Sequence, residues 1–171
     1  MRAREIAWGC AWLLFLGGCA AGLSPAVRRE ATPVKGLEAI RAAPDGFRGK
    51  TVILGGEIVE TRNRPDGTTL VVLEKPLDIF RKPRDVDATG GRFLATFSRY
   101  LDPMLYAKGR RVTVAGVVSG EATEPVGDAP YRYIVLEGVE VHLWTPSREV
   151  FPSSSYRYPW WYDGGAGAPP W

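Results

Sequence analysis

Residues 51–60 read TVILGGEIVE, and residues 111–118 read RVTVAGVV. In both stretches apolar residues recur at every second position, which is the period of a β-strand. The residues of one parity are Val52, Leu54, Gly56 and Ile58 in the first stretch and Val112, Val114, Gly116 and Val118 in the second. Both stretches are therefore predicted to be strands with one face in a core.

The two stretches also repeat each other weakly at an offset of 60 residues. Three glycine and valine positions are identical, namely Gly49, Val52 and Gly56 against Gly109, Val112 and Gly116. Three identities in 11 positions indicate two similar glycine-edged strands rather than an internal duplication.

Three further strands are predicted around these two. Residues 69–74 (TLVVLE) return from the first strand through the turn Pro65-Asp66-Gly67, because proline presets φ and glycine accepts a positive φ. Residues 92–97 form the third strand, after a loop over 75–90 that contains two prolines. In the last strand, 131–144, the apolar parity changes at Gly138, which predicts a bulge.

Two short helices complete the pattern. Residues 36–43 place apolar side chains on one helical face and are expected to stop at Pro44-Asp45-Gly46. Residues 102–109 begin with Asp102 as N-cap and Pro103 at the first helical position, and Gly109 follows the end.

The predicted fold class is mainly β: a small five-stranded OB-like barrel with one short helix between strands three and four, plus a short N-terminal helix. The order of the elements matches that of an OB-fold. A plain β-sandwich is the alternative.

The N-terminus has the pattern of an export signal. Arg2 and Arg4 precede an uncharged apolar run over residues 6–16, about half the roughly 20 residues that a membrane-spanning helix needs. The following Leu16-Gly17-Gly18-Cys19 resembles a bacterial lipobox. The resemblance implies cleavage before Cys19, a diacylglycerol on its sulfur and an acylated amino terminus. The alternatives are a hydrophobic N-terminal helix with an incidental cysteine, or a signal peptide cleaved elsewhere.

Four segments follow from these patterns. Residues 1–18 are the lipoprotein signal peptide, 19–35 the lipidated N-terminus and a tether, 36–145 the OB-like β domain, and 146–171 a tail rich in proline, glycine and aromatic residues. The tail's tryptophans and tyrosines suit a membrane interface, a carbohydrate or a protein partner. Alternatively, the tail covers the barrel or stays disordered.

Few residues are candidates for chemistry. The chain has one histidine, His142, and two cysteines, Cys10 and Cys19, which excludes a disulfide scaffold and a zinc site. No nucleophile elbow or nucleotide-binding motif occurs in the sequence. We therefore expect a non-enzyme without catalytic residues, metal or cofactor. An enzyme centred on His142, which shares a strand face with Glu140 and Trp144, is the weakest of the hypotheses.

A ligand face is the stronger alternative to a purely structural module. In OB-folds, loops flank the ligand-binding strands, and the corresponding loops here are 62–68 and 121–129. The possible ligand-face or loop residues are Arg62, Arg64, His142 and Trp144. Without residues 1–18 the formal charge falls from +3 to only +2, because that segment holds two arginines and one glutamate. Nucleic acid is therefore not expected as a partner.

Several motifs after Cys19 resemble the Slp family of starvation-inducible outer-membrane lipoproteins. They are Phe93-Leu94-Ala95, Tyr100-Leu101-Asp102-Pro103 with Tyr106, Arg111-Val112-Thr113-Val114 with Gly116 and Gly120, Tyr133 through Leu136-Glu137 to Leu143-Trp144, and Lys75-Pro76-Leu77-Asp78 to Lys82-Pro83. The resemblance implies a lipoprotein of Gram-negative bacteria that is expressed under starvation or in stationary phase. It brings no catalytic residues, and the tail differs from the family in being short.

The leading hypothesis is a non-enzymatic lipoprotein of the outer membrane with its β module facing the periplasm and a role in envelope integrity or stress. Its partners would be the bilayer, through acylated Cys19, and an envelope protein or glycan. The residues after Cys19 are Ala20 and Ala21, without the aspartate that in this class signals retention in the inner membrane. The alternative is a periplasmic ligand-binding module for envelope glycan or lipid headgroups.

Overall fold

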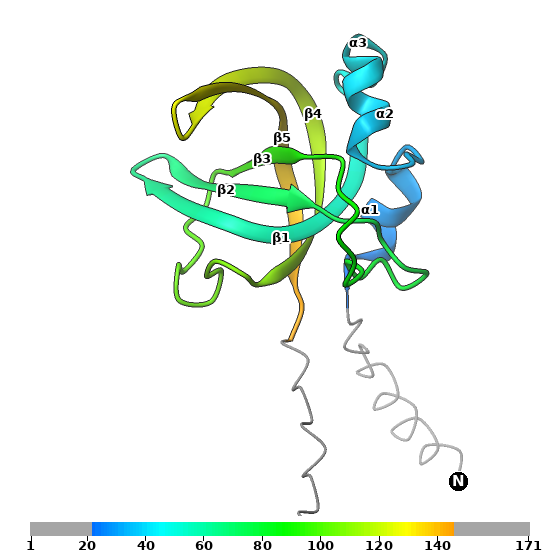
Figure 1. Cartoon of the computed structure of the whole chain (residues 1–171). Helices are drawn as coiled ribbons and strands as arrows, with labels where there is room; N and C mark the ends of the chain where they lie inside the picture. The colour runs from blue at the N-terminus through cyan, green and yellow to red at the C-terminus, as the bar shows by residue number, and fades with distance from the viewer. Residues whose placement is uncertain (1–21, 146–171) are drawn as a thin grey trace, which may run out of the picture.

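Five strands form a closed barrel in the order β1-β2-β3-β5-β4 (Figure 1). The structure is a computed structural model, and it describes residues 22–145. The strands are β1 (Thr51–Arg64), β2 (Gly67–Glu74), β3 (Arg92–Phe97), β4 (Arg111–Val126) and β5 (Ala129–Leu143). All neighbours are antiparallel except β3 and β5, which run parallel. The prediction of a mainly β, five-stranded OB-like barrel is confirmed.

The barrel interior is filled by the alternating apolar residues of the strands. The buried side chains that share this core include Val52, Leu54, Leu70, Val72, Phe93, Val112, Val114, Ile134 and Leu136. Helix α2 (Leu37–Ala42) adds Leu37 and Ile40, which are fully buried in the same core. The short helix predicted over 36–43 is therefore confirmed, and its apolar face contributes to the barrel core.

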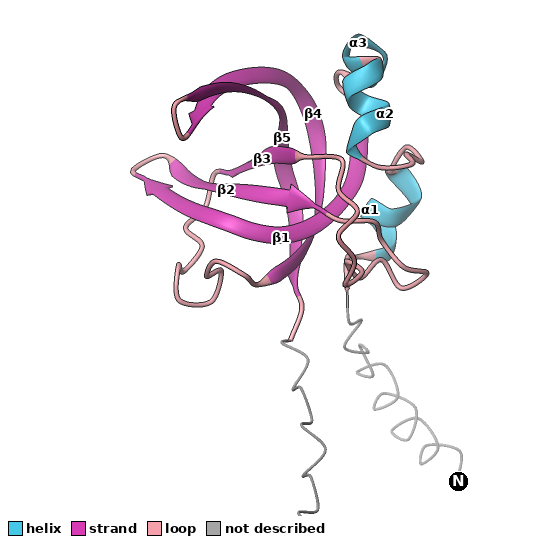
Figure 2. Ribbon diagram, in the orientation of Figure 1, coloured by secondary structure: helices cyan, strands magenta, loops and turns pink. Residues whose placement is uncertain are grey.

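A second helix, α1 (Pro25–Glu30), covers part of the barrel's outer face, and Figure 2 shows all three helices along one side of the barrel. Leu23 and Val27 pack with Ile53 and Ala115, outward-facing residues of β1 and β4. The side chain of Ser24 caps the helix by accepting the Val27 backbone N–H at 3.3 Å. The outer faces of β1 and β4 are therefore buried here as well as their inner faces.

The prediction of a tether over residues 19–35 was wrong for its described part. One apolar residue per turn, Leu23, Val27 and then Ala31, meets an apolar outer face that the sequence pattern did not reveal. The segment is also tied down after the helix, because the Thr32 N–H donates to the Thr51 carbonyl at 2.8 Å. Tertiary packing selects a helix that is too short to form alone.

The distal halves of β4 and β5 extend beyond the barrel as a two-stranded arm. Its residues pair from Gly120 with Val135 to Val126 with Ala129, so the loop predicted over 121–129 is strand apart from its turn. Tyr133 of the arm packs with Val71 and Leu94, which face outward from β2 and β3. The arm thus buries a second patch of outer surface and explains why those strands are apolar on both faces.

The helix predicted over 102–109 was wrong. Its start behaves as expected, because the Asp102 carboxylate accepts the Met104 N–H at 2.8 Å and the Asp102 carbonyl accepts two further N–H groups. The chain then leaves the helical path, since the Gly109 N–H donates to the Ile58 carbonyl of β1 at 2.8 Å. This hydrogen bond to β1 fixes the C-terminal end of segment 102–109, so the segment forms consecutive turns instead of a helix.

Two turn predictions had different outcomes. The bulge at Gly138 is confirmed: Ala115 lies opposite Glu140 and Gly116 opposite Gly138, so Val139 is the extra residue. In contrast, Pro44-Asp45-Gly46 does not merely stop α2. It opens α3 (Pro44–Phe47), a single turn in which proline occupies the first helical position.

The repeat at an offset of 60 residues has a structural basis in the pairing of β1 with β4. Val52 lies opposite Gly116, and Gly56 opposite Val112. The Gly49 N–H donates to the Val118 carbonyl and the Gly109 N–H to the Ile58 carbonyl, both at 2.8 Å. Equivalent positions thus exchange equivalent bonds, as in an antiparallel pair related by a local two-fold axis. The interpretation as two similar strands is consistent with this pairing.

Candidate functional site

The first candidate site is the end of the barrel where the described chain begins and ends. Figure 1 shows that the loops between β2 and β3 and between β3 and β4 lie at this same end. We define the terminal face as residues 22–23, 77–83, 98–110 and 143–145. The other candidate site is a hollow beside the β1–β2 hairpin.

Trp144, in the terminal face, contacts His142, which lies just outside it. Their rings contact edge to face, with centroids 4.5 Å apart. The indole N–H of Trp144 donates to the hydroxyl of buried Thr113 at 2.9 Å, and that hydroxyl donates to the Arg81 carbonyl at 2.6 Å. These bonds fasten the loop that contains Arg81 to β4 and to the end of β5.

The environment of His142 does not resemble that of a catalytic base. Burial lowers the pKa of His142 below 6.5, so the ring is neutral at pH 7. Among the described residues, no carboxylate hydrogen-bonds to its ring; Glu140 instead accepts the Ser24 backbone N–H at 2.8 Å. His142 therefore lacks the acidic partner that orients a general base in a catalytic triad.

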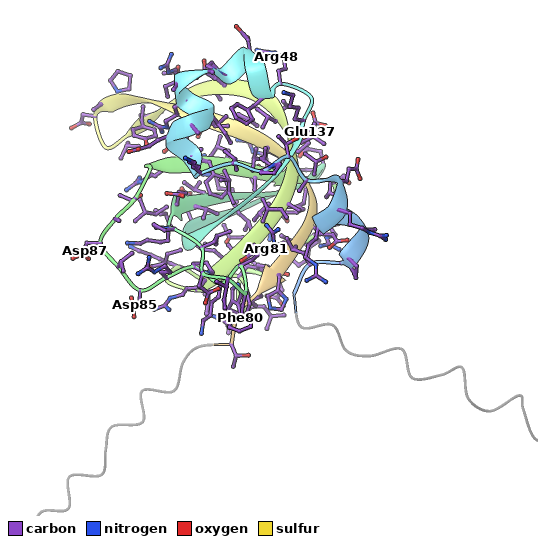
Figure 3. The ribbon with its side chains drawn as sticks, turned by 90° about the vertical axis from the view of Figure 1, so that its right-hand side faces the viewer. Arg48, Phe80, Arg81, Asp85, Asp87 and Glu137 are labelled. Atoms are coloured by element: carbon purple, nitrogen blue, oxygen red, sulfur yellow. The ribbon has the colours of Figure 1, made fainter. Side chains whose placement is uncertain are left out.

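A cavity of about 310 Å³ lies beside these two rings. Its wall includes Leu23 from the start of the described chain, Arg28 from α1, and Phe80 and Arg81 from the loop. In Figure 3, Phe80 lies at the same end of the barrel as the two ends of the described chain, and Arg48 lies at the opposite end. The cavity therefore brings apolar and basic side chains together at the terminal face.

The loop 77–83 holds a defined shape through its own hydrogen bonds. The Asp78 carboxylate accepts the backbone N–H groups of Phe80 and Lys82, at 2.8 and 2.9 Å. The Arg81 N–H donates to the Asp78 carbonyl at 2.9 Å, and Arg81 adopts a positive φ of 63°. This tight turn leaves Ile79 90% and Phe80 75% exposed.

Arg62, predicted as a ligand-face residue, is engaged within the protein. Its guanidinium lies 2.8 Å from a Glu60 carboxylate oxygen and 2.5 Å from one of Glu124. The hydrogen bond to Glu60, and then that to Glu124, raises the pKa of Arg62 above its ordinary value. Glu124 belongs to β4, so this pair holds the arm to β1 instead of facing a ligand.

Arg64 is exposed at the end of β1 and lines the second hollow, of about 540 Å³. Its wall is mixed: polar side chains such as Asp66, Thr69, Thr96 and Glu137 stand beside the apolar Phe97, Val117 and Val139. The four predicted ligand-face residues are thus divided: Arg64 lines this hollow, His142 and Trp144 line the other, and Arg62 lines neither. The structure does not bring them into one site.

Sequence reasoning did not identify Ile79, Phe80 or Arg28. A signal for the first two was present, because two large apolar residues stand in a predicted loop between Pro76 and Pro83. Arg28 lay in the predicted tether, so its place on a packed helix was not foreseen. Cys19 and the tail over 146–171 lie outside the described residues.

Two features are absent from residues 22–145. No helix in that range is long and apolar enough to cross a membrane. In the same part of the chain, no three His, Cys, Asp or Glu side chains gather closely enough to hold a metal ion.

Comparison with known proteins places this chain among the lipoproteins of the outer membrane. The model of the outer membrane lipoprotein Slp family matches residues 16–167. The chain belongs to that family. The match extends over the whole described barrel, its arm and both flanking helical segments.

Relatives in Escherichia coli K12 are similar over most of their length. The chain is 29% identical over 156 residues to the uncharacterized lipoprotein YeaY, covering 91% of this chain and 80% of that one. It is 31% identical over 140 residues to the outer membrane protein Slp, covering 79% and 73%. A small single-stranded DNA-binding protein of Streptomyces coelicolor aligns with a TM-score of 0.31 and 15% identity over 53% of this chain and 90% of that one. A likeness this weak carries no functional argument.

Proposed function

We propose that this chain is a non-enzymatic outer-membrane lipoprotein, anchored through acylated Cys19, whose barrel faces the periplasm and supports the envelope under starvation or other stress. The observation that carries the proposal is the spacing at the N-terminus. Leu23, the first packed residue of the described range, follows Cys19 by four positions, soon after a segment with the pattern of a removable signal. A lipid on Cys19 would hold the folded barrel at the membrane surface.

The non-enzymatic part of the proposal is supported by the one histidine. Burial and the contact with Trp144 give His142 a structural environment, and its neighbour Glu140 is committed to the Ser24 N–H. The expected test is that His142→Ala preserves whatever envelope phenotype the wild-type chain complements. Loss of complementation, with normal protein levels, would point to chemistry at His142.

Labelling with radioactive palmitate tests the anchor. Wild type should incorporate label and Cys19→Ala should not, because the acyl groups attach to the residue-19 sulfur and amino group. The matched control is Cys10→Ala, which removes the other cysteine from a segment that is cleaved off and should label like wild type. Equal labelling of the Cys19→Ala chain would refute the anchor.

Orientation and role need separate measurements. If the barrel faces the periplasm, added protease will digest it only after the outer membrane is permeabilised; digestion in intact cells would place it on the outside. A strain without the chain should lose viability faster in prolonged starvation, and the full-length gene should restore survival. Identical survival of both strains would remove the stress role.

A second candidate function is binding of an envelope glycan or lipid headgroup in the hollow at Arg64. The hydroxyls of Thr69 and Thr96 and the charges of Arg64 and Glu137 suit a polyhydroxylated ligand. Isothermal titration with soluble peptidoglycan fragments should show binding that Arg64→Ala weakens and that Arg28→Ala, in the wall of the other cavity, leaves intact. Absence of heat with the wild-type chain would exclude those fragments as ligands.

A further inference from the structure

Two large apolar side chains project from the terminal face, and no other part of residues 22–145 covers them. Ile79 is 90% and Phe80 75% exposed, although the loop that carries them is held in one shape by Asp78. Met104 and Leu105, in the second loop of this face, are 85% and 56% exposed. A water-soluble surface does not usually gather several such residues at one end.

The charges around these residues are mostly basic. Residues 77–83 and 98–110 contain five basic side chains, Arg81, Lys82, Arg99, Lys108 and Arg110, and two acidic ones, Asp78 and Asp102. Both acidic groups are turned toward their own loops, where they accept backbone N–H groups. Basic side chains therefore outnumber acidic ones by three in these two segments, and the nearby Asp85 is paired with Arg111.

The terminal face lies close to the N-terminal segment, and this position limits which surfaces it can contact. Leu23 is packed against the barrel, and it shares a cavity with Phe80 and Trp144. Two residues, Ala20 and Ala21, separate Cys19 from Gly22. The three residue steps from Cys19 to Gly22 span at most about 11 Å when fully extended. An acyl group on Cys19 would therefore bring the terminal face to within a headgroup's depth of the bilayer.

We propose that the terminal face is a phospholipid-contacting surface, with Ile79 and Phe80 inserted in the interfacial zone of the bilayer and the basic side chains at the phosphate groups. This inference rests on the proposed anchor at Cys19. Apolar tips with flanking Lys and Arg are the chemistry that an anionic lipid surface recognises. Trp144, close to Lys82 (5.9 Å from the ring centroid), has the amphipathic ring found at membrane interfaces.

The test uses the full-length lipoprotein, purified after processing and reconstituted in vesicles of phosphatidylethanolamine and phosphatidylglycerol. With Cys10 cleaved off and Cys19 acylated, a nitroxide label will react only at an introduced cysteine. Phe80→Cys carries the label on the terminal face, and Arg48→Cys carries it at the opposite end as the matched control (Figure 3). Collision of the label with oxygen, which dissolves in lipid, and with a water-soluble nickel chelate reports its depth.

We expect the label at residue 80 to lose collisions with nickel and gain collisions with oxygen on reconstitution, while the label at residue 48 stays accessible to nickel. Vesicles of phosphatidylcholine alone should reduce the effect, because this zwitterionic lipid lacks the anionic charge. If the chain floats with the vesicles but both labels remain equally accessible to nickel, the face does not contact lipid and the inference is overturned, with the anchor intact.

Other outcomes are also decisive. A chain that does not float with the vesicles refutes the anchor and the inference together. A label at residue 80 that is shielded from both reagents and broadened by a neighbouring label would show that a second copy of the chain covers the face, which also overturns the inference. The double variant Ile79→Ser/Phe80→Ser should float normally, because the lipid alone retains it.

Discussion

Gly56 of β1 lies close against the backbone of β2. A Cβ at this position would collide with the backbone carbonyl of Leu73, which cannot move aside without breaking the β1–β2 pairing. Gly56 therefore permits the close pairing of β1 with β2 that the closed barrel needs. Gly116, its counterpart in β4, permits the same close approach to the Glu137 carbonyl.

We expect Gly56→Ala to lower the free energy of unfolding by about 1–3 kcal/mol, the usual cost of overpacking a core. Gly46→Ala is the control, because its nearest neighbour would be the Ala43 side chain at 3.9 Å and alanine favours helix over glycine by about 0.5–1 kcal/mol. Urea unfolding of both variants measures the difference. Equal stability of Gly56→Ala and wild type would mean that the two strands lie farther apart.

His142 gives the molecule a pH dependence of known sign. Burial lowers its folded-state pKa below 6.5, so the unfolded chain takes up the proton more readily than the folded chain. The free energy of unfolding should therefore fall as the pH decreases through 6.5 toward the folded-state pKa. Most carboxylates titrate at lower pH, and Glu60, whose pKa Arg62 lowers, does so too.

The measurement compares the melting temperatures of wild type and His142→Gln between pH 7.5 and pH 5.5. The glutamine variant should lose less stability over this range, because it has no group to protonate. A parallel decline of both proteins would mean that His142 titrates alike in the folded and unfolded states.

At the scale of elements, the strands were predictable and the helices only partly so. The period-2 pattern identified all five strands, and the parity change at Gly138 located the bulge. The pattern could not show that β1, β2 and β3 are apolar on both faces because α1 and the arm cover the outside, since these partners are distant in sequence. The helix expected at Asp102 failed for a related reason: a hydrogen bond from Gly109 to Ile58 outweighs a favourable cap.

The candidate site, too, was only partly predictable from the sequence. Residue types pointed to His142 and Trp144, and the structure places these two in contact. Arg62 looked like a free loop cation because its partner Glu124 is 62 residues away and the arm that carries it was predicted as loop. Ile79 and Phe80 were missed because exposure of an apolar residue depends on the absence of a tertiary partner, which a strand pattern does not report.

The packing of α1 on the barrel can be tested through Val27. Val27→Ala should lower the free energy of unfolding by about 1–2 kcal/mol, at about 0.8 kcal/mol per buried methylene. Arg29→Ala, on the exposed side of the same helix, should change it by less than about 0.5 kcal/mol. If the two variants were equally stable, residues 24–35 would behave as the tether that their composition suggested.

For the whole molecule, the length of the short link between the proposed anchor at Cys19 and the barrel should matter more than the sequence of that link. Inserting about 12 glycine and serine residues between Ala20 and Ala21 gives a flexible segment with a root-mean-square span of about 20 Å. The inserted chain should still float with vesicles, but the label at residue 80 should regain collisions with nickel, because the face is no longer held at the surface. An unchanged collision profile would mean that Ile79 and Phe80 bind lipid without help from the anchor.

The parallel pairing of β3 with β5 also determines when the barrel can close as the chain is exported. Phe93 pairs with Ile134, so the barrel closes only after nearly the whole described chain is available, and such distant contacts form slowly. A chain exported from its N-terminus would present residue 19 to the membrane before residue 134 emerges. Val27 must then wait for Ala115 of β4 before it can be buried. Such a lipoprotein would therefore meet the membrane that it crosses before its barrel can close, and the barrel would fold next to that membrane.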